Sequence, residues 1–372
     1  MTTAKTPLIV HLIAAARPNF MKIAPLYHAL VRETWCAPKL VHTGQHYDPN
    51  MSDAFFRDLD MPQPHIHLGV GSGTHAEQTG GVMIAYEKAC ATERPDWIVV
   101  VGDVNSTAAC AMVGAKLWIP VIHLEAGLRS RDRRMPEEIN RLVTDAICDV
   151  LWTPSPDADE NLRNEGVPAS RIERVGNIMI DSYVMVRDHI EADQTRASMK
   201  LEPGGYGVVT LHRPSNVDDQ TTLKLLVDQL LSISGKLTLV FAVHPRTRKK
   251  LEEFGLLQRL QENTAIKLTE PLGYIQFMNL VSSARMVITD SGGVQEESTY
   301  LGIPCLTLRE NTERPITVSE GSNRLVQPQR VVDTVDEILN GKWSGGRRPE
   351  YWDGQTAQRC VASLRRLIGI QN

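Results

Sequence analysis

The sequence lacks the features that mark disulfide-bonded, membrane-spanning and nucleic-acid-binding proteins. Its six cysteines are spread through 372 residues without a Cys-x-x-Cys pair, which favours reduced core thiols over a disulfide framework. No uninterrupted apolar run approaches the length that crosses a membrane. The formal net charge of -4 offers no general attraction to nucleic acid or to an anionic membrane. We therefore expect neither a nucleic-acid nor a membrane partner.

Motifs of three common enzyme classes are also absent from the sequence. No G-x-G-x-x-G follows a strand, and there is neither a Walker A lysine loop nor a G-x-S-x-G elbow. These absences argue against bound NAD, ATP hydrolysis and serine-esterase chemistry, and we expect no cofactor. His65 and His67 have the spacing of a metal-ligating pair, but no further ligand lies at a useful spacing. A structural role is favoured for them, and no metal site is expected.

The overall composition is that of an ordinary globular protein, with 42% hydrophobic and 23% charged residues. The length suffices for two domains, each with its own core. The first apolar segment, residues 8–16, is similar in composition to a short secretory signal. However, His11 interrupts it, and Arg17-Pro18 follows in what reads as a strand-to-helix turn. We interpret the segment as the first core strand and expect a cytoplasmic protein.

Strand and helix patterns alternate along the whole chain. In the first half, strands are expected at Leu8–Ala14, Leu40–Thr43, Trp97–Val101, Val121–Leu124, Leu151–Thr153 and Ile172–Val175. In the second half, strands are expected at Gly207–Leu211, Leu237–Val243, Ile266–Leu268, Met286–Thr289 and Cys305–Leu308, with one of the intervening helices over Thr247–Leu260. Repeated βα units predict an α/β fold of two doubly wound parallel sheets with an interdomain cleft. The pattern weakens between Glu191 and Gly205, so the predicted domains are residues 1–190 and 205–352.

Three acidic sites of the first half occupy positions that face a ligand crevice. Asp103 and Glu125 come at the ends of two expected strands, and a third acidic site opens a helix at Pro136-Glu137-Glu138. The carboxyl ends of parallel strands line the crevice in open α/β sheets. One interpretation is that these acids cap helices and pair with neighbouring arginines. The other, which their number favours, is a site that handles protons beside an anionic substrate.

In the second half, the segment Thr289–Gly293 joins a strand to a helix through small residues. A helix that begins at Ser291, Gly292 and Gly293 offers free backbone N–H groups to a phosphate, and the glycines permit close approach. One turn later, Glu297 is placed to accept hydrogen bonds from a ribose diol. The alternative is a tight turn with a capped helix, and the turn alone does not decide between the two.

Basic residues and histidines also lie next to strand ends. Arg17 and Lys22 flank the first turn of the first half, where the alternatives are a phosphate clamp and an ordinary solvated pair. His212 and His244 directly follow second-half strands, and each has an arginine nearby. Two histidines at equivalent strand ends favour a site over isolated surface residues.

Seven segments taken together resemble the UDP-N-acetylglucosamine 2-epimerase family. They follow the family's order over nearly the whole chain: residues 16–26, Gly102-Asp103, His123–Arg129, Pro136–Arg141, Leu211–Pro214, Asp290–Gly293 and Thr312–Pro315. The resemblance implies the glycosyltransferase-B fold, in which two Rossmann-like domains flank a cleft and the second holds most of the nucleotide. It also implies a C-terminal helix, residues 355–370, that packs back on the first domain. A UDP-sugar substrate and a homodimer are further implications.

The same resemblance implies roles for individual residues. Asp103, Glu125 and Glu137 match the catalytic acids, and His212 matches the catalytic histidine. Substrate-binding positions of the family are matched by Arg17, Lys22, Arg141, His244, Ser291, Gly292, Gly293, Glu297 and Arg314. Asn19 stands where a first-turn acid is common, and Tyr47-Asp48-Pro49 follows Gln45-His46. These two departures disfavour activation by a second substrate molecule.

One chemistry fits the residues independently of the resemblance. The C2 proton of an N-acetylhexosamine is not acidic, so without NAD the simplest inversion is anti elimination of UDP from C1 to a 2-acetamidoglucal. Protonation on the opposite face and re-addition of UDP then give the epimer. We predict this non-hydrolysing interconversion of UDP-GlcNAc and UDP-ManNAc. The alternatives are a hydrolysing epimerase that releases ManNAc and UDP, a glycosyltransferase of the same fold, and a nucleotide-sugar sensor without catalysis.

Overall fold

The computed structural model describes residues 6–15, 17–44 and 59–370, except for the side chain of Arg17. The chain divides into two compact units. Unit 1 comprises Met1–Met185 and Glu350–Asn372, and unit 2 comprises Val186–Pro349. Among the described residues, no helix has both the length and the apolar character needed to cross a membrane.

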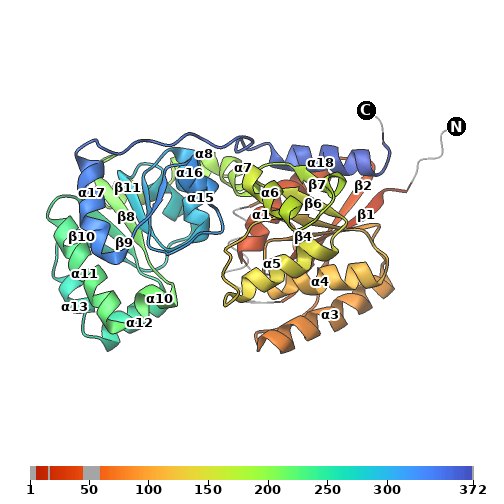
Figure 1. Ribbon diagram of the computed structural model, residues 1–372, viewed down its shortest axis with the longest axis horizontal. Coiled ribbons are helices and arrows are strands. Elements are labelled where there is room, and N and C mark those ends of the chain that lie inside the picture. Colours follow the sequence, from red (N-terminus) through yellow and green to blue (C-terminus); the bar gives the residue numbers. More distant parts are fainter. Residues whose placement is uncertain (1–5, 16, 45–58, 371–372) are drawn as a thin grey trace. The chain divides into compact units, whose positions relative to one another are not determined.

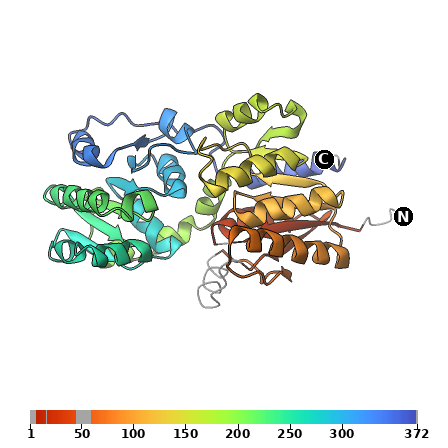
Figure 2. The same ribbon diagram turned by 60° about the horizontal axis from the view of Figure 1, so that its bottom comes forward.

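Unit 1 is built on a parallel sheet with seven strands in its described part. The strands are β1 (Leu8–Ala14), β2 (Cys36–His42), β3 (Ile66–His67), β4 (Trp97–Val101), β5 (Val121–Leu124), β6 (Val150–Thr153) and β7 (Ile172–Arg174), in the order β3-β2-β1-β4-β5-β6-β7. The helices are α1 (Arg17–Leu30), α3 (His75–Thr92), α4 (Asn105–Lys116), α5 (Pro136–Ile147), α6 (Pro156–Asn164), α7 (Ile178–Met185) and α18 (Thr356–Leu367). Strands such as β4 and β5 are apolar on nearly every position because helices cover both faces of the sheet. One face carries α3, α4 and α5 side by side, and α1 packs against α7 and α18 (Figures 1 and 2).

Unit 2 repeats this plan with a parallel sheet of six strands. They are β8 (Tyr206–Thr210), β9 (Thr238–Ala242), β10 (Ile266–Thr269), β11 (Met286–Thr289), β12 (Cys305–Thr307) and β13 (Asn323–Leu325), in the order β10-β9-β8-β11-β12-β13. The helices are α8 (Arg187–Ala192), α9 (Thr195–Ser198), α10 (Pro214–Val217), α11 (Gln220–Ser234), α12 (Pro245–Glu253), α13 (Leu257–Gln261), α14 (Tyr274–Val281), α15 (Gly292–Leu301), α16 (Ile316–Ser319) and α17 (Val331–Leu339). One core cluster joins the apolar faces of α11 and α17 to the sheet.

The strand orders place a reversal point in each sheet. The chain winds outward from β1 to β3 and then returns to β4 on the other side of β1; in unit 2 it returns likewise from β10 to β11 beside β8. Ligands of such sheets bind outside the carboxyl ends of the strands at this reversal. The residues that follow β1, β4 and β5, and those that follow β8 and β11, are therefore the ones placed for a ligand.

Two sequence-based expectations are wrong. The helix expected over Thr247–Leu260 is divided into α12 and α13, because Gly255 adopts a left-handed φ of 66° just after α12 ends. The expected linker after Glu191 contains α9 and belongs to unit 2. The Asn279 side chain ties it there, because its amide donates to the Ile190 carbonyl at 2.8 Å and its oxygen accepts from the Arg196 N–H at 2.9 Å.

The C-terminal segment returns to unit 1 through buried polar contacts. The Asp181 carboxylate in α7 accepts a hydrogen bond of 2.8 Å from the backbone N–H of Ala357, in the first turn of α18. Farther along α18, the Ser363 hydroxyl oxygen accepts a 2.9 Å hydrogen bond from Trp152 Nε1 in β6. Both of these contacts join residues more than 170 positions apart in the sequence, so α18 completes a layer of unit 1 that the first half leaves open.

Candidate active site

Glu125 occupies a constrained position at the end of β5. Its backbone φ is +71°, a left-handed conformation that is costly for a residue with a Cβ, and its side chain is only 2% exposed. One carboxylate oxygen forms an ion pair with Nζ of Lys22 in α1. The other, Oε1, is buried and has no hydrogen-bond partner among the described residues. A buried carboxylate oxygen without a partner is unusual, and a group that supplied it with a proton or a hydrogen bond would satisfy it.

The turn after β4 brings Asp103 close to this carboxylate. Gly102 has a left-handed φ of 69°, and a Cβ there would lie 3.4 Å from Lys22 Nζ and 3.5 Å from Glu125 Oε2. The Asn19 amide donates to the Val101 carbonyl at 3.1 Å, which fixes α1 against the end of β4. An ionised acid at position 19 has no proton to donate in this bond. The departure from the family pattern at Asn19 therefore has a structural consequence.

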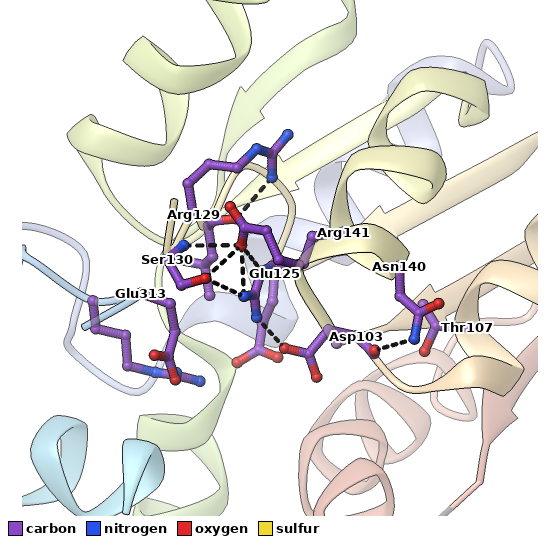
Figure 3. Close-up of polar contacts among 12 residues, drawn as sticks. Asp103, Thr107, Glu125, Arg129, Ser130, Asn140, Arg141 and Glu313 are labelled. Carbon is purple, nitrogen blue, oxygen red and sulfur yellow. Dashed lines mark hydrogen bonds and ion pairs between the residues drawn. The ribbon is translucent and has the colours of Figure 1, made fainter. Parts of the chain in front are cut away.

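Arg141 in α5 forms the ion pair with Asp103 that is drawn in Figure 3, and it also contacts a second, buried acid. Its guanidinium forms an ion pair with Asp103 and hydrogen bonds of 2.6 and 3.0 Å with Glu138 Oε2. Glu138 also accepts from the Ser130 N–H at 2.9 Å. Burial acts to raise the pKa of the Glu138 carboxyl, but the Ser130 N–H and Arg141 outweigh it, so the pKa is lowered. Glu138 is therefore a fixed anion that orients Arg141 toward Asp103. Glu137, the residue expected from sequence, is partly exposed in the same helical turn.

A buried network of hydrogen bonds and ion pairs stabilises the ends of β4 and β5. His123 in β5 contacts Asp145 Oδ1 at 2.6 Å through Nδ1 and the Gly102 carbonyl at 2.9 Å through Nε2. Asp145 also forms an ion pair of 2.7 Å with Arg129. Burial acts to raise the pKa of the Asp145 carboxyl, but His123 and Arg129 lower it. These contacts hold the backbone that carries Asp103.

In unit 2, His212 follows β8 and lies against the end of β11. Its Nδ1 lies 2.8 Å from Oδ1 of Asp290, which is fully buried. Asp290 Oδ2 accepts from the N–H groups of His212 and Arg213 at 3.0 and 2.9 Å and from Asn216 Nδ2 at 3.0 Å. Burial acts to raise the pKa of the Asp290 carboxyl, but the hydrogen bond from His212 and its neighbours lower it. His244, at the N-terminus of α12, has its ring centroid 5.6 Å from that of His212.

The N-terminus of α15 follows β11 directly. Gly292 and Gly293 form its first turn, where backbone N–H groups have no partner within a helix. A Cβ at Gly292 would lie 2.8 Å from Glu313 Oε1 and 3.0 Å from Arg314, whereas one at Gly293 would meet nothing within 4 Å. Arg314 forms ion pairs of 2.6 Å with Glu313 and 2.8 Å with Glu296. The first turn of α15 thus combines open N–H groups with a fixed guanidinium, as an anion site requires.

Glu297 is buried one turn farther along α15, with 4% exposure. Burial raises the pKa of its carboxyl to about 8, the neighbouring Glu296 acts in the same direction, and Tyr274 acts in the opposite one. Desolvation thus leaves the acid largely protonated at neutral pH. Nothing in the sequence pattern predicts this, because the shift depends on burial.

The structure brings most of the expected site residues into two groups. In unit 1, Lys22 pairs with Glu125 and Arg141 pairs with Asp103, at the ends of the neighbouring strands β5 and β4. Unit 2 holds the other expected residues at the ends of β8, β9 and β11 and in the segment after β12: His212, His244, Ser291, Gly292, Gly293, Glu297 and Arg314. The side chain of Arg17 and the segment from Gln45 to Pro49 lie outside the described residues. Within the described ranges, no cluster of three potential metal ligands occurs.

Sequence reasoning assigned no role of its own to Glu138 or to Asp290. The i, i+3 spacing of Glu138 and Arg141 on one helix was a usable signal for the buried pair, since such residues are neighbours on a helix surface. Asp290 follows β11 as Asp103 follows β4, so its strand-end position was visible in the sequence. Its contact with His212 depends on the pairing of β8 with β11, which the sequence does not reveal.

Comparison with known proteins identifies the relatives of this chain. The family model for UDP-N-acetylglucosamine 2-epimerase matches residues 28–365. The UDP-N-acetylglucosamine 2-epimerase of Methanocaldococcus jannaschii is 41% identical over 363 residues, which cover 95% of this chain and 98% of that protein. The UDP-2,3-diacetamido-2,3-dideoxy-D-glucuronate 2-epimerase of Pseudomonas aeruginosa is 37% identical over 360 residues, covering 95% and 99%.

Solved structures agree on fold and family. The crystal structure of M. jannaschii UDP-GlcNAc 2-epimerase in complex with UDP-GlcNAc and UDP has a TM-score of 0.86 and 40% identity, covering 96% of this chain and 100% of that one. Sucrose-phosphate synthase from Thermosynechococcus elongatus, with a TM-score of 0.65, 15% identity and coverage of 98% and 100%, shares the glycosyltransferase-B fold alone. The matched residues, the identities and the nearly complete coverage lead to one conclusion: this chain belongs to the UDP-N-acetylglucosamine 2-epimerase family.

Proposed function

We propose that the chain interconverts UDP-GlcNAc and UDP-ManNAc without releasing the free sugar. The observation that carries the proposal is the buried Glu125 carboxylate next to the Gly102-Asp103 turn. One of its oxygens is paired with Lys22, and the other has no hydrogen-bond partner among the described residues. Acids held in this way suit a reaction whose difficult step is removal of a proton from carbon. Relatives that carry the 2-epimerase name support the same reaction.

The proposed reaction balances without a redox cofactor. A carboxylate takes the C2 proton, the C2–H electron pair forms the C1=C2 bond, and the C1–O bond breaks so that UDP leaves with its electron pair. Return of a proton to the other face of C2, with attack of UDP on C1, gives the epimer. Asp103, Glu125 and Glu137 are the proposed acids and bases of unit 1, with Lys22 and Arg141 as their cationic partners. Arg17 belongs to the same proposed set.

The proposed nucleotide site is the end of the unit 2 sheet. The first turn of α15 would hold a pyrophosphate through the backbone N–H groups of Gly292 and Gly293. The N–H of Ser291 donates to the Thr289 hydroxyl at 3.0 Å, so Ser291 would contribute its own hydroxyl. Arg314 would supply positive charge beside it, and Glu297 would accept hydrogen bonds from the ribose diol. His212 is proposed to exchange a proton with the substrate, and His244 to contact it.

Proton NMR of the purified protein with UDP-GlcNAc in D2O tests the proposal. We expect UDP-ManNAc with deuterium at C2, deuterium wash-in to the remaining UDP-GlcNAc, and no accumulation of free sugar. Free ManNAc and UDP in equal amounts would instead identify a hydrolysing epimerase. Absence of any C2 exchange, together with tight UDP binding, would refute catalysis on this sugar and favour a sensor or a transferase that needs an acceptor.

The 37% identical relative from P. aeruginosa makes a second substrate worth measuring. Its name specifies a 2,3-diacetamido uronate, a larger and more negative sugar than GlcNAc. Parallel assays with both UDP-sugars decide between them, since the same C2 chemistry applies to each. A kcat/KM at least tenfold higher for the uronate would transfer the proposal to that substrate.

The homodimer implied by the family resemblance and the cytoplasmic location expected from the N-terminal segment remain parts of this proposal. Light scattering coupled to size-exclusion chromatography tests the first: twice the 41.4 kDa chain mass is expected. Fractionation of the native cells, with detection of the intact chain, tests the second.

A further inference from the structure

We infer that Asp290 is a positioning residue that fixes the tautomer of His212, and that the N-terminus of α12 fixes the opposite tautomer of His244. The two rings, at the ends of the adjacent strands β8 and β9, would then present an Nε2 lone pair and an Nε2–H from rings whose centroids lie 5.6 Å apart. The assignment of each ring proton rests on hydrogen-bond partners alone. Only its consequence for catalysis rests on the function proposed above.

The His212 assignment follows from the chemistry of its partner. Asp290 is an ionised carboxylate and accepts hydrogen bonds only. Nδ1 of His212, 2.8 Å from Asp290 Oδ1, must therefore carry a proton. In the neutral ring the lone pair is then on Nε2, and the side chain remains 38% exposed. His212 thus exchanges protons with a ligand through Nε2.

The His244 assignment is the reverse, for an equally local reason. The backbone N–H of Arg246, in the first turn of α12, donates to Nδ1 of His244 at 3.2 Å. A backbone N–H is always a donor, so Nδ1 must be the unprotonated nitrogen and Nε2 carries the proton. Burial and the neighbouring His212 both lower the pKa of His244, which keeps the ring neutral. His244 is therefore a neutral hydrogen-bond donor.

Because their tautomers differ, the His212 and His244 rings can have different roles. The Nε2–H of His244 suits an oxyanion such as a pyrophosphate oxygen, which accepts hydrogen bonds only. Nε2 of His212 suits proton transfer, because its partner Asp290 stabilises the charged ring after a proton is taken up. Arg213, Arg246 and Asp218 are the other charged residues next to these strand ends.

Asp290→Asn is a sharp test because the geometry dictates how the new amide must be placed. The position of Oδ2 receives three donors, from the N–H groups of His212 and Arg213 and from Asn216 Nδ2, so the amide oxygen must occupy it. The amide NH2 then occupies the position of Oδ1 and donates to Nδ1 of His212. The three contacts at the Oδ2 position are retained, the longer 3.1 Å contact of the His212 N–H with the Oδ1 position is lost, and the proton of His212 must move to Nε2.

Long-range 1H–15N correlation NMR on histidine-labelled protein reads these tautomers directly, with ring signals assigned from His212→Asn and His244→Asn. In the native protein at pH 8 we expect Nδ1–H for His212 and Nε2–H for His244. Asp290→Asn should switch His212 to Nε2–H, whereas Asn216→Ser, which removes a different donor to the same carboxylate, should leave it unchanged. A native His212 with its proton on Nε2, or an unchanged tautomer in Asp290→Asn, would overturn the inference.

Kinetics supply the second readout. Asp290→Asn should lower kcat at least tenfold with a smaller effect on KM, because the substrate meets a proton where it needs a lone pair. His244→Asn retains an N-cap residue for α12 but loses the ring donor, so it should raise KM more than it lowers kcat. Equal kinetic effects of Asp290→Asn and Asn216→Ser would refute the positioning role. If the native protein turns over neither UDP-sugar, the proposed function fails, while the NMR result still decides the tautomers.

Discussion

Binding of UDP should release a proton from Glu297. Burial raises the pKa of this carboxyl to about 8, so at pH 7 only about one tenth of the ligand-free protein carries the charged form. A ribose diol donates two hydrogen bonds and therefore favours the carboxylate. Removing the proton at pH 7 costs about 1.4 kcal/mol, a factor of about 10 in affinity. Because the free protein holds the proton and the complex does not, affinity should rise with pH, by about 25-fold between pH 6.5 and 8.5.

Isothermal titration calorimetry in buffers of different ionisation enthalpy measures this proton directly. At pH 7 we expect release of about 0.9 proton per UDP bound. Glu297→Gln is the control, since it removes the titrating group while the histidines and the UDP phosphates titrate as before. Protonated histidines attract phosphate and act in the opposite direction with pH, so the difference between the two proteins isolates Glu297. Equal proton release by both proteins would refute the role assigned to this carboxyl.

Three further predictions concern stability. Asp181→Asn should raise the free energy of unfolding at pH 8 by up to about 3 kcal/mol, because burial raises the pKa of the Asp181 carboxyl to about 6 and its charged form opposes folding. The gain should shrink as the pH falls from 6 toward 4 and vanish by about pH 3, where the acid is protonated in both states; urea titrations at pH 8 and pH 3 check this. The Glu125→Gly variant should have a free energy of unfolding about 1 kcal/mol higher than that of Glu125→Ala, because residue 125 has a left-handed φ of 71°. Both variants should lose activity. Equal urea midpoints for the two variants would contradict backbone strain at this position. Gly292→Ala should lower Tm by forcing Glu313 and Arg314 aside, whereas Gly293→Ala should leave it unchanged in calorimetry.

Strand positions were largely readable from the sequence because buried parallel strands are short runs of branched apolar residues. β1, β4, β5 and β11 match their expected bounds. β2 begins four residues earlier than expected, since Pro38 and Lys39 interrupt the apolar run. β3 has only two residues and offers no periodicity to detect. The helix α17, by contrast, buries Val331, Thr334, Val335 and Ile338 at helical spacing, so its signal was present and overlooked.

The sequence predicted the location of the candidate site better than the contacts within it. Polar residues at the ends of parallel strands must meet at one edge of a sheet, so Asp103 and Glu125 could be grouped from sequence. The packing of α1 decides that Lys22 is the partner of Glu125. The packing of α5 decides that Glu138, and not Glu137, is the buried acid. The raised pKa of Glu297 depends on desolvation, which is a property of the folded chain alone.

The return of α18 to unit 1 has a consequence for the order in which the protein matures on the ribosome. Unit 2 is continuous in sequence, so it has all its parts as soon as Pro349 is outside the exit tunnel. Unit 1 is complete only later, because two of its contacts need residues of α18: Ala357, which donates to Asp181, and Ser363, which accepts from Trp152. At ordinary elongation rates these residues are synthesised roughly 10 to 30 s after the first half. During that interval, the faces of α1 and α7 that α18 will cover are open to chaperones and to other nascent chains. The synthesis of α18 therefore sets the time at which the exposed faces of α1 and α7 in unit 1 are covered.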